Sequence, residues 1–148
     1  MTTFSWTAVE DAVLTALEAR VGPLAQTLKT YQGDWLEDLR TQGWRLPAVL
    51  LLLERSRAEQ MTARSFDVIL DFRLLVVVRQ LRGEEAGRRE EGGVYQILAE
   101  IREALWNQDL GLEILPLALI QEEPLLNTQE FTVYAADYRT GAVRDIGA

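Results

Sequence analysis

The sequence predicts an α+β fold in which a mostly antiparallel four-stranded sheet carries helices packed on one face. Residues 7–20 and 94–105 repeat apolar side chains at the 3.6-residue period of a helix. Residues 66–79 alternate with the period of two that is typical of a strand. The order along the chain is helix, hairpin, helix, hairpin. We therefore expect a single domain over residues 1–140, followed by a short C-terminal tail over residues 141–148.

The first helix is predicted over residues 7–20. Thr7 and Glu10 match a capping box, in which the side chain of each residue accepts a hydrogen bond from the backbone N–H group of the other. The pair Gly22-Pro23 ends the helix. Residues 23–42 predict two further short helical turns, joined at Gly33-Asp34. The helical spacing involves Leu24, Leu28 and Tyr31 before this joint, and Trp35, Leu36 and Leu39 after it.

The first hairpin is predicted to join strands at residues 47–55 and 66–79. Residues 46–53 form a short apolar run, which is typical of a strand buried on both faces. The polar residues 55–65 then form an extended hairpin tip. One face of the second strand carries Phe66, Val68, Leu70, Phe72, Leu74, Val76 and Val78, and the other carries Asp67, Ile69, Asp71, Arg73, Leu75, Val77 and Arg79.

The second helix, residues 94–105, has the clearest apolar stripe of the chain and is expected to lie against the sheet. Residues 112–121 and 131–139 predict the second hairpin. Turn-forming residues at 122–124 and 127–128 separate its strands. The stripe of the helix consists of Val94, Ile97, Leu98, Ile101 and Leu105.

The composition excludes several classes of function. The 148 residues carry a formal net charge of −8 and include neither His nor Cys. Imidazole catalysis, thiolate chemistry, disulfides and most zinc sites are therefore ruled out. The acidity argues against nucleic-acid binding, since Lys and Arg must neutralise phosphates. We expect no catalytic residue, no cofactor and no metal site, and we expect that the chain is not an enzyme.

Neither a membrane span nor secretion is expected. The longest apolar run, residues 46–53, is far shorter than the roughly 20 residues that cross a bilayer. No basic residue precedes Arg20, and no apolar block precedes a small-residue cleavage site. Synthesis in the cytoplasm is the expectation that follows.

Two groups of carboxylates are candidates for chemistry. Asp67 and Asp71 share a strand face, but their spacing places them roughly 13 Å apart, too far to flank one bond. We expect both to lie in water. Glu122, Glu123 and Glu130 could bind a hard cation, but no Asp-x-Asn-x-Asp calcium loop is present.

Residues 79–91 form the most distinctive segment outside the expected core, with four Arg and four Glu. Blocks of both signs can pair with the same segment of a neighbouring subunit in a head-to-tail ring. A solvated loop is the alternative. Trp35, Trp44 and Trp106 are either buried anchors or interface anchors. The candidate interface residues are Arg79, Arg82, Glu84, Glu85, Arg88, Arg89, Glu90 and Trp44.

With these elements placed, most of the chain resembles the tail-protein family of Mu-like phages and prophages that is described as tail terminator or tail-completion protein. Residues 54–64 depart from the resemblance, being richer in charge. The matching features are, in order, Val9-Glu10-Asp11-Ala12-Val13, Thr30-Tyr31-Gln32-Gly33-Asp34, Leu46-Pro47-Ala48-Val49, Arg79 with Arg82-Gly83-Glu84, Gly93-Val94-Tyr95-Gln96-Ile97-Leu98, Leu110-Gly111-Leu112 and Val133-Tyr134.

The resemblance implies a structural virion protein that forms a six-membered ring on the head-proximal end of the tail tube, stops tube polymerisation and joins the tail to the head. The implied partners are further copies of the chain, the tail-tube protein and a head-tail connector or neck protein. No sequence-specific nucleic acid and no membrane are expected as partners. The implied location is the tail of the virion, after synthesis in the cytoplasm of the bacterial host. An acidic ring lumen would repel the phosphates of passing DNA.

Two alternatives stay open at this stage. The chain could form the head-tail connector or neck rather than cap the tail. It could also be a non-viral, monomeric binding module of a bacterium, for which the same fold is suitable.

Overall fold

A computed structural model describes residues 5–60, 65–79, 88–89 and 93–145. Within these residues, five strands form one sheet in the order β1-β2-β3-β5-β4. β1 runs parallel to β2, and the other neighbouring strands are antiparallel. The elements are α1 (Trp6–Val21), β1 (Thr27–Thr30), α2 (Trp35–Thr41), β2 (Ala48–Gln60), β3 (Ser65–Arg79), α4 (Val94–Leu105), β4 (Ala118–Asn127) and β5 (Phe131–Asp145).

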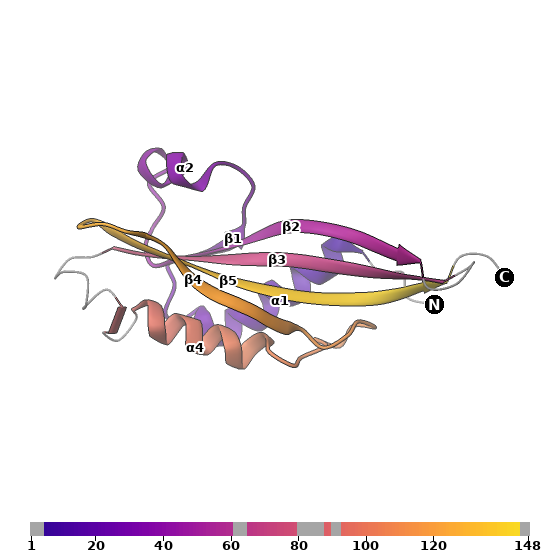
Figure 1. The fold of residues 1–148 in the computed structure, drawn as a ribbon. Helices are drawn as coiled ribbons and strands as arrows, with labels where there is room; N and C mark the ends of the chain where they lie inside the picture. Colours follow the sequence, from indigo (N-terminus) through magenta and orange to yellow (C-terminus); the bar gives the residue numbers. More distant parts are fainter. Residues whose placement is uncertain (1–4, 61–64, 80–87, 90–92, 146–148) are drawn as a thin grey trace.

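Helices lie on both faces of this sheet, which differs from the one-sided arrangement that the sequence predicts. α1 and α4 cover one face, whereas α2 covers one end of the other face (Figure 1). The reason is that β2 and β3 carry apolar side chains on both faces at that end of the sheet. Leu50 and Leu75 there need a second cover, which α2 supplies through Leu39.

β1 is the strand that the sequence analysis missed, and it changes the predicted four-stranded sheet into a mixed five-stranded one. The helical spacing of Leu24 and Leu28 suggested a helical turn, but residues 27–30 pair instead with β2, from Thr27 opposite Ala48 to Thr30 opposite Leu51. A strand of four residues is too short to show a period of its own. The second predicted turn is confirmed as α2, where Asp34 accepts a hydrogen bond from the Glu37 amide.

The first hairpin is longer than predicted, because β2 continues to Gln60 and β3 begins at Ser65. The polar residues 55–60, which were expected in the tip, pair with β3 in register. Cross-strand charge pairs such as Arg55 with Asp71 stabilise this part of the ladder in place of apolar burial. The tip itself lies outside the described residues.

The last hairpin is shifted along the chain. β4 spans Ala118–Asn127 rather than residues 112–121, and it includes Pro124. Proline is tolerated there because β4 is an edge strand, and the register shifts next to Pro124. β5 continues to Asp145, past the predicted start of the tail at residue 141, and Ala142 is buried.

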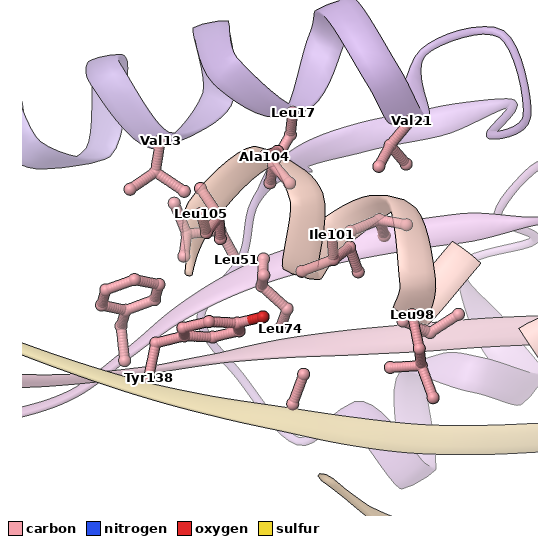
Figure 2. Close-up of a cluster of buried hydrophobic side chains, with 14 of the residues drawn as sticks. Val13, Leu17, Val21, Leu51, Leu74, Leu98, Ile101, Ala104, Leu105 and Tyr138 are labelled. Atoms are coloured by element: carbon pink, nitrogen blue, oxygen red, sulfur yellow. The ribbon is translucent and has the colours of Figure 1, made fainter. Parts of the chain in front are cut away.

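α1 and α4 pack side by side on the sheet to form the larger core (Figure 2). The predicted span of α4 is confirmed, and α1 extends the prediction by one residue at each end. Ser5 caps α1 by accepting a hydrogen bond of 3.1 Å from the Ala8 amide, so the predicted capping box at Thr7 is wrong. The labelled core residues of Figure 2 are Val13, Leu17, Val21, Leu51, Leu74, Leu98, Ile101, Ala104, Leu105 and Tyr138.

The predicted alternation of β3 is confirmed. Leu70, Phe72, Leu74, Val76 and Val78 belong to the core under α1 and α4. Leu75 and Val77 belong to the smaller core under α2. No helix in the described part of the chain is long and apolar enough to span a membrane.

We predict that Ile101→Ala lowers the free energy of unfolding by about 2–5 kcal/mol, because it leaves a cavity between α4 and the sheet. Urea denaturation followed by circular dichroism measures this change. Glu103→Ala on the exposed side of the same helix is the matched control, with an expected change within about 0.5 kcal/mol. Equal losses in both variants would contradict this assignment of the core face.

Tyr138 leads to a second prediction. Its side chain is fully buried and stacks on Phe72, and its hydroxyl group lies among apolar side chains with no hydrogen-bond partner in the described residues (Figure 2). Burial raises the pKa of this hydroxyl. Since an unpaired buried hydroxyl costs desolvation energy, we expect Tyr138→Phe to leave the free energy of unfolding unchanged or to raise it by up to about 1 kcal/mol. A clear loss in urea denaturation would show that the hydroxyl is bonded.

Candidate interaction surfaces

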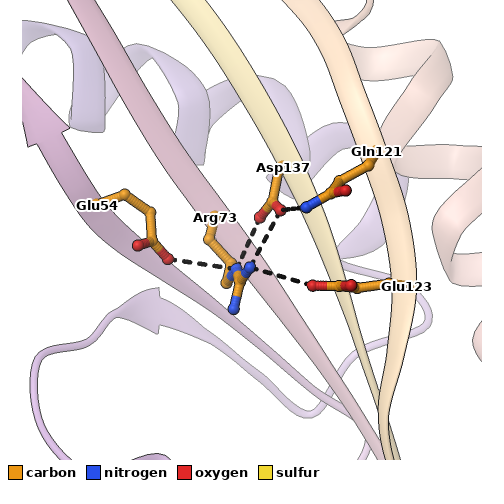
Figure 3. Close-up of polar contacts among 5 residues, drawn as sticks. All are labelled: Glu54, Arg73, Gln121, Glu123 and Asp137. Carbon is orange, nitrogen blue, oxygen red and sulfur yellow. Dashed lines mark hydrogen bonds and ion pairs between the residues drawn. The ribbon is translucent and has the colours of Figure 1, made fainter.

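The sheet face that α2 leaves uncovered is lined by ion pairs, with Arg73 at their centre (Figure 3). The Arg73 guanidinium donates two hydrogen bonds to Asp137, of 2.7 Å from Nε and 3.1 Å from Nη2. Glu54 lies 3.3 Å away and Glu123 lies 3.4 Å away. Gln121 also donates to Asp137, at 2.8 Å. Since these residues come from β2, β3, β5 and β4, the network ties four strands together.

Asp71 is the centre of a second cluster on the same face. It accepts hydrogen bonds of 2.7 Å from Arg139 Nε and 3.1 Å from Arg55 Nε, and its side chain is only 14% exposed. Desolvation raises the pKa of Asp71, but the hydrogen bonds from Arg139 and Arg55 outweigh it and leave the pKa below its ordinary value. The prediction that Asp71 lies in water is therefore wrong. The strand register brings arginines from β2 and β5 to either side of it.

We call these two clusters together the charged face. The lowered pKa of Asp71 keeps this carboxylate ionised, so it is poorly suited to act as a general acid. The arginines of the charged face are already paired, and its polar groups keep an uncovered sheet face compatible with water. The members of the charged face are Glu54, Arg55, Asp71, Arg73, Gln121, Glu123, Asp137 and Arg139.

The structure describes only part of the predicted interface segment. Arg79 ends β3 with an exposed side chain, whose guanidinium lies 5.3 Å from the ring centre of Phe131 and 3.9 Å from Glu130. Arg88 and Arg89 lie in a helical turn, the first partly buried and the second exposed. The other candidates, Arg82, Glu84, Glu85 and Glu90, fall outside the described residues.

The tryptophans divide into two groups. Trp35 and Trp44 are partly buried and pack against the smaller core, and Trp44 contacts the Tyr31 ring edge-to-face at 5.4 Å. The Tyr31 hydroxyl donates to Asp38, and desolvation together with that carboxylate raises the pKa of Tyr31. Trp106 differs from both, because it is 47% exposed at the end of α4. Trp106 is thus the most solvent-exposed of these three tryptophans.

Two further apolar side chains are exposed in a way that the sequence analysis missed. The apolar run of residues 112–121 was expected to form a strand, which would bury one of its faces. Instead, Leu115 is 64% exposed and Ile120 is 49% exposed. The signal available in the sequence was the surplus of apolar residues in this run, more than one sheet edge can bury.

A shallow apolar crevice lies between the start of α1 and the sheet. Glu10 is the only charged residue that lines it, and no nucleophile and base are placed together there. Glu122 and Glu123, which were considered for a cation, are instead paired with Arg102 and Arg73. Among the described residues, no group of three His, Cys, Asp or Glu could hold a metal ion.

Comparison with known families adds an observation that covers almost the whole domain. Residues 5–142 match the family model described as Bacteriophage Mu, Gp37. The chain belongs to this family. It is therefore a Mu-like phage protein, as the sequence resemblance implied, and the Mu Gp37 family points to a structural protein of the phage. No curated protein matches the chain.

The Mu Gp37 match begins at the cap of α1 and ends at Ala142 within β5. Both helix layers, the charged face and the exposed Trp106 thus lie inside the matched region.

We predict that Asp71→Asn lowers the free energy of unfolding by about 1 kcal/mol at pH 7, because two arginines lose their shared carboxylate. The pKa of Asp71 in the folded state lies below the ordinary value of 3.8. The stabilisation is therefore complete above that value and is lost as the pH falls through the folded pKa. The difference between wild type and variant should shrink in urea denaturation performed below pH 3.8.

Asp67→Asn is the matched control for this prediction, since it lies on the same face of the same strand. We expect a smaller loss of stability from Asp67→Asn at pH 7. An equal loss at pH 7, or a loss from Asp71→Asn that is independent of pH, would show that the ion pairs do not stabilise the fold.

Proposed function

We propose that the chain is a tail terminator of a Mu-like phage. In this proposal, copies of the chain form a ring on the head-proximal end of the tail tube, and the resemblance implies six copies. The ring stops tube polymerisation and joins the tail to the head. The tail-tube protein and a connector or neck protein are its partners, and the virion tail is its location after synthesis in the host cytoplasm.

The observation that carries this proposal is the Mu Gp37 family match over residues 5–142. The sequence motifs that resemble those of tail terminators support the finer assignment. The absence of His and Cys from the chain supports a role in assembly rather than catalysis. The pairing of the carboxylates on the charged face with arginines supports the same role.

The two unlike edges of the sheet support a head-to-tail arrangement. β1 and β4 are its two edges, and β1 pairs with only the first part of β2, from Ala48 to Leu51. Beyond Leu51, β2 has a second open edge within the described residues. β2 and β4 run in opposite directions. When two copies lie side by side in the same orientation, the β2 edge of one copy is therefore antiparallel to the β4 edge of the other. A contact between different edges is heterologous, and such contacts form a ring when the rotation between neighbouring copies closes.

Residues 79–91 remain the proposed charged contact between subunits or with the tube. Arg79 is exposed at the end of β3, as such a contact requires. Charge-assisted contacts between exposed groups weaken when salt screens them.

The test is tube assembly with purified components. We expect the tail-tube protein of the same phage to form shorter tubes when the chain is added, with a ring visible at one end by electron microscopy. Light scattering of the chain alone should show an oligomer whose mass falls as salt is raised. Binding to the portal complex but not to the tube would favour a connector instead. A protein that stays monomeric and binds neither would contradict both roles.

A further inference from the structure

The outer edge of β2 is open over most of the strand. β1 pairs only with residues 48–51, and the last bond on this side runs from the Tyr31 amide to the Leu51 carbonyl, at 2.8 Å. Along residues 52–60, the described part of the chain places no strand beside β2, which is the outer strand in the half of the sheet that ends in its arrowhead (Figure 1). Residues 54–60 are all exposed. This stretch therefore offers backbone N–H and C=O groups to another strand.

The strand register identifies the residues that bond toward the open edge. In an antiparallel pair, a strand bonds its neighbour through alternate residues, and the residues between them bond on the other side. Leu51, opposite Leu74, bonds outward to Tyr31. One extra residue in β2, at the register shift between Leu53 and Arg55, moves this alternation by one position. The outward-bonding residues beyond the shift are therefore Ser56, Ala58 and Gln60, which lie opposite Leu70, Val68 and Phe66.

The two outer strands differ in how well their edges are protected. β4 carries Pro124, which has no N–H group to donate, and its register shifts at two places. β2 contains neither Pro nor Gly between its register shift and Gln60. Proline and bulges are common means of blocking an edge, so β4 is blocked whereas the second half of β2 is accessible.

The charges on this half of β2 are not matched within the chain. Arg57 and Glu59 lie opposite Ile69 and Asp67, on the same side of the sheet as the charged face. Arg57 thus faces an apolar residue, and Glu59 faces a second carboxylate, which is unfavourable for residues directly opposite each other. Among the described residues, no ion pair includes Arg57, Glu59 or Asp67.

The neighbouring part of the charged face provides the contrast. There, Asp71 lies between Arg55 and Arg139, and both guanidinium groups donate to it. The pKa of Arg139 is raised chiefly by its hydrogen bond to Asp71, and Glu59 makes only a minor contribution through space. The mismatch therefore lies at the end of β2, where a second chain can supply the opposite charges.

We propose that the outer edge of β2 pairs with the same edge of a second copy of this chain, in an antiparallel two-fold contact centred on Ala58. In this register, Arg57 lies opposite Glu59 of the second copy, and the symmetry repeats this pair. Ser56 lies opposite Gln60 of the second copy, so outward-bonding residues face each other. A shift by two residues in either direction places Arg57 opposite Arg57, or Glu59 opposite Glu59. The order of charges on β2 thus favours the register centred on Ala58.

This contact goes beyond the proposed function and does not rest on it. Charged residues on an edge strand often prevent pairing, but a guard of that kind repels a second copy, whereas Arg57 and Glu59 attract one in this register. The contact is isologous. An edge that is paired in this way is not open to β4 of a neighbour, so the dimer is a state of the chain outside the ring. Because the contact is small, the dimer is weak and depends on concentration.

Cysteine cross-linking tests the register, since the chain contains no cysteine. Ala58→Cys places two thiols opposite each other across the axis, so we expect a disulfide-linked dimer under mild oxidation. Ser56→Cys is the matched control on the same exposed edge, because its two thiols lie about 13 Å apart along the strands. It should give little product alone and a dimer when mixed with Gln60→Cys. Equal product from Ser56→Cys alone and Ala58→Cys alone would overturn the register.

Charge reversal tests the chemistry of the contact. Arg57→Glu and Glu59→Arg should each weaken dimerisation by about 10-fold, because each turns two attractive pairs into repulsive ones. A mixture of the two variants should associate again, since every pair then joins opposite charges, and the double variant should recover for the same reason. Arg40→Glu makes the same change of charge at an exposed position on α2 and should have no effect.

Analytical ultracentrifugation measures the dissociation constants, and circular dichroism confirms that each variant is folded. A mixture that fails to associate, or an equal loss from Arg40→Glu, would contradict the pairing of Arg57 with Glu59.

The dimer and the proposed function can fail separately, because capping is measured with the unmodified chain on tail tubes. If the chain caps tubes but neither dimerises nor cross-links through Ala58→Cys, the dimer is wrong and the proposed function stands. If it dimerises with the expected dependence on charge but does not cap tubes, the proposed function is wrong and the dimer stands. Self-association that Arg57→Glu leaves unchanged would overturn the assignment to the β2 edge.

Discussion

The alternation of β3 is the constraint on which the rest of the structure depends. One face of this central strand is apolar from Leu70 to Val78, and it supports α1 and α4 along its length. The other face is apolar only at Leu75 and Val77, and it is charged at Asp71 and Arg73. Because a strand presents alternate residues to opposite faces, these two patterns decide where each helix can lie.

The charged face follows from the second pattern. The β3 face that carries Asp71 and Arg73 has no apolar side chains to bury at these positions, so it does not need a helix to cover it. Ion pairs between neighbouring strands line it instead. The bidentate contact of Arg73 with Asp137 joins β3 to β5, while Glu54 and Glu123 extend the network to β2 and β4. Ion pairs that are partly shielded by their neighbours also favour one strand register over others, since a slip would set like charges opposite each other.

The two sides of the molecule differ in what they leave exposed. Trp106, Leu115 and Ile120 are exposed near the β4 edge, whereas the β1 side presents charges of both signs, such as Lys29 and Glu37. A contact between unlike edges of two copies would be heterologous, which is the type of contact that a ring requires. This asymmetry connects the fold to the ring that we propose for a member of the Mu Gp37 family.

The sequence by itself determined the elements in which a regular apolar period continues over many residues. These are α4, most of α1, and the assignment of the β3 residues to the two faces of the sheet. It also determined that His and Cys chemistry is absent, and its order of short motifs indicated a Mu-like phage protein.

Only the tertiary structure decided the rest. β1 is a strand because β2 offers it a partner, and Asp71 is shielded because two other strands bring arginines to it. Such pairings join residues far apart in the chain, and local periodicity does not contain them. The exposure of Leu115 and Ile120 was decided in the same way, since the apolar run at residues 112–121 leads into β4, an edge strand of the sheet that the described residues form.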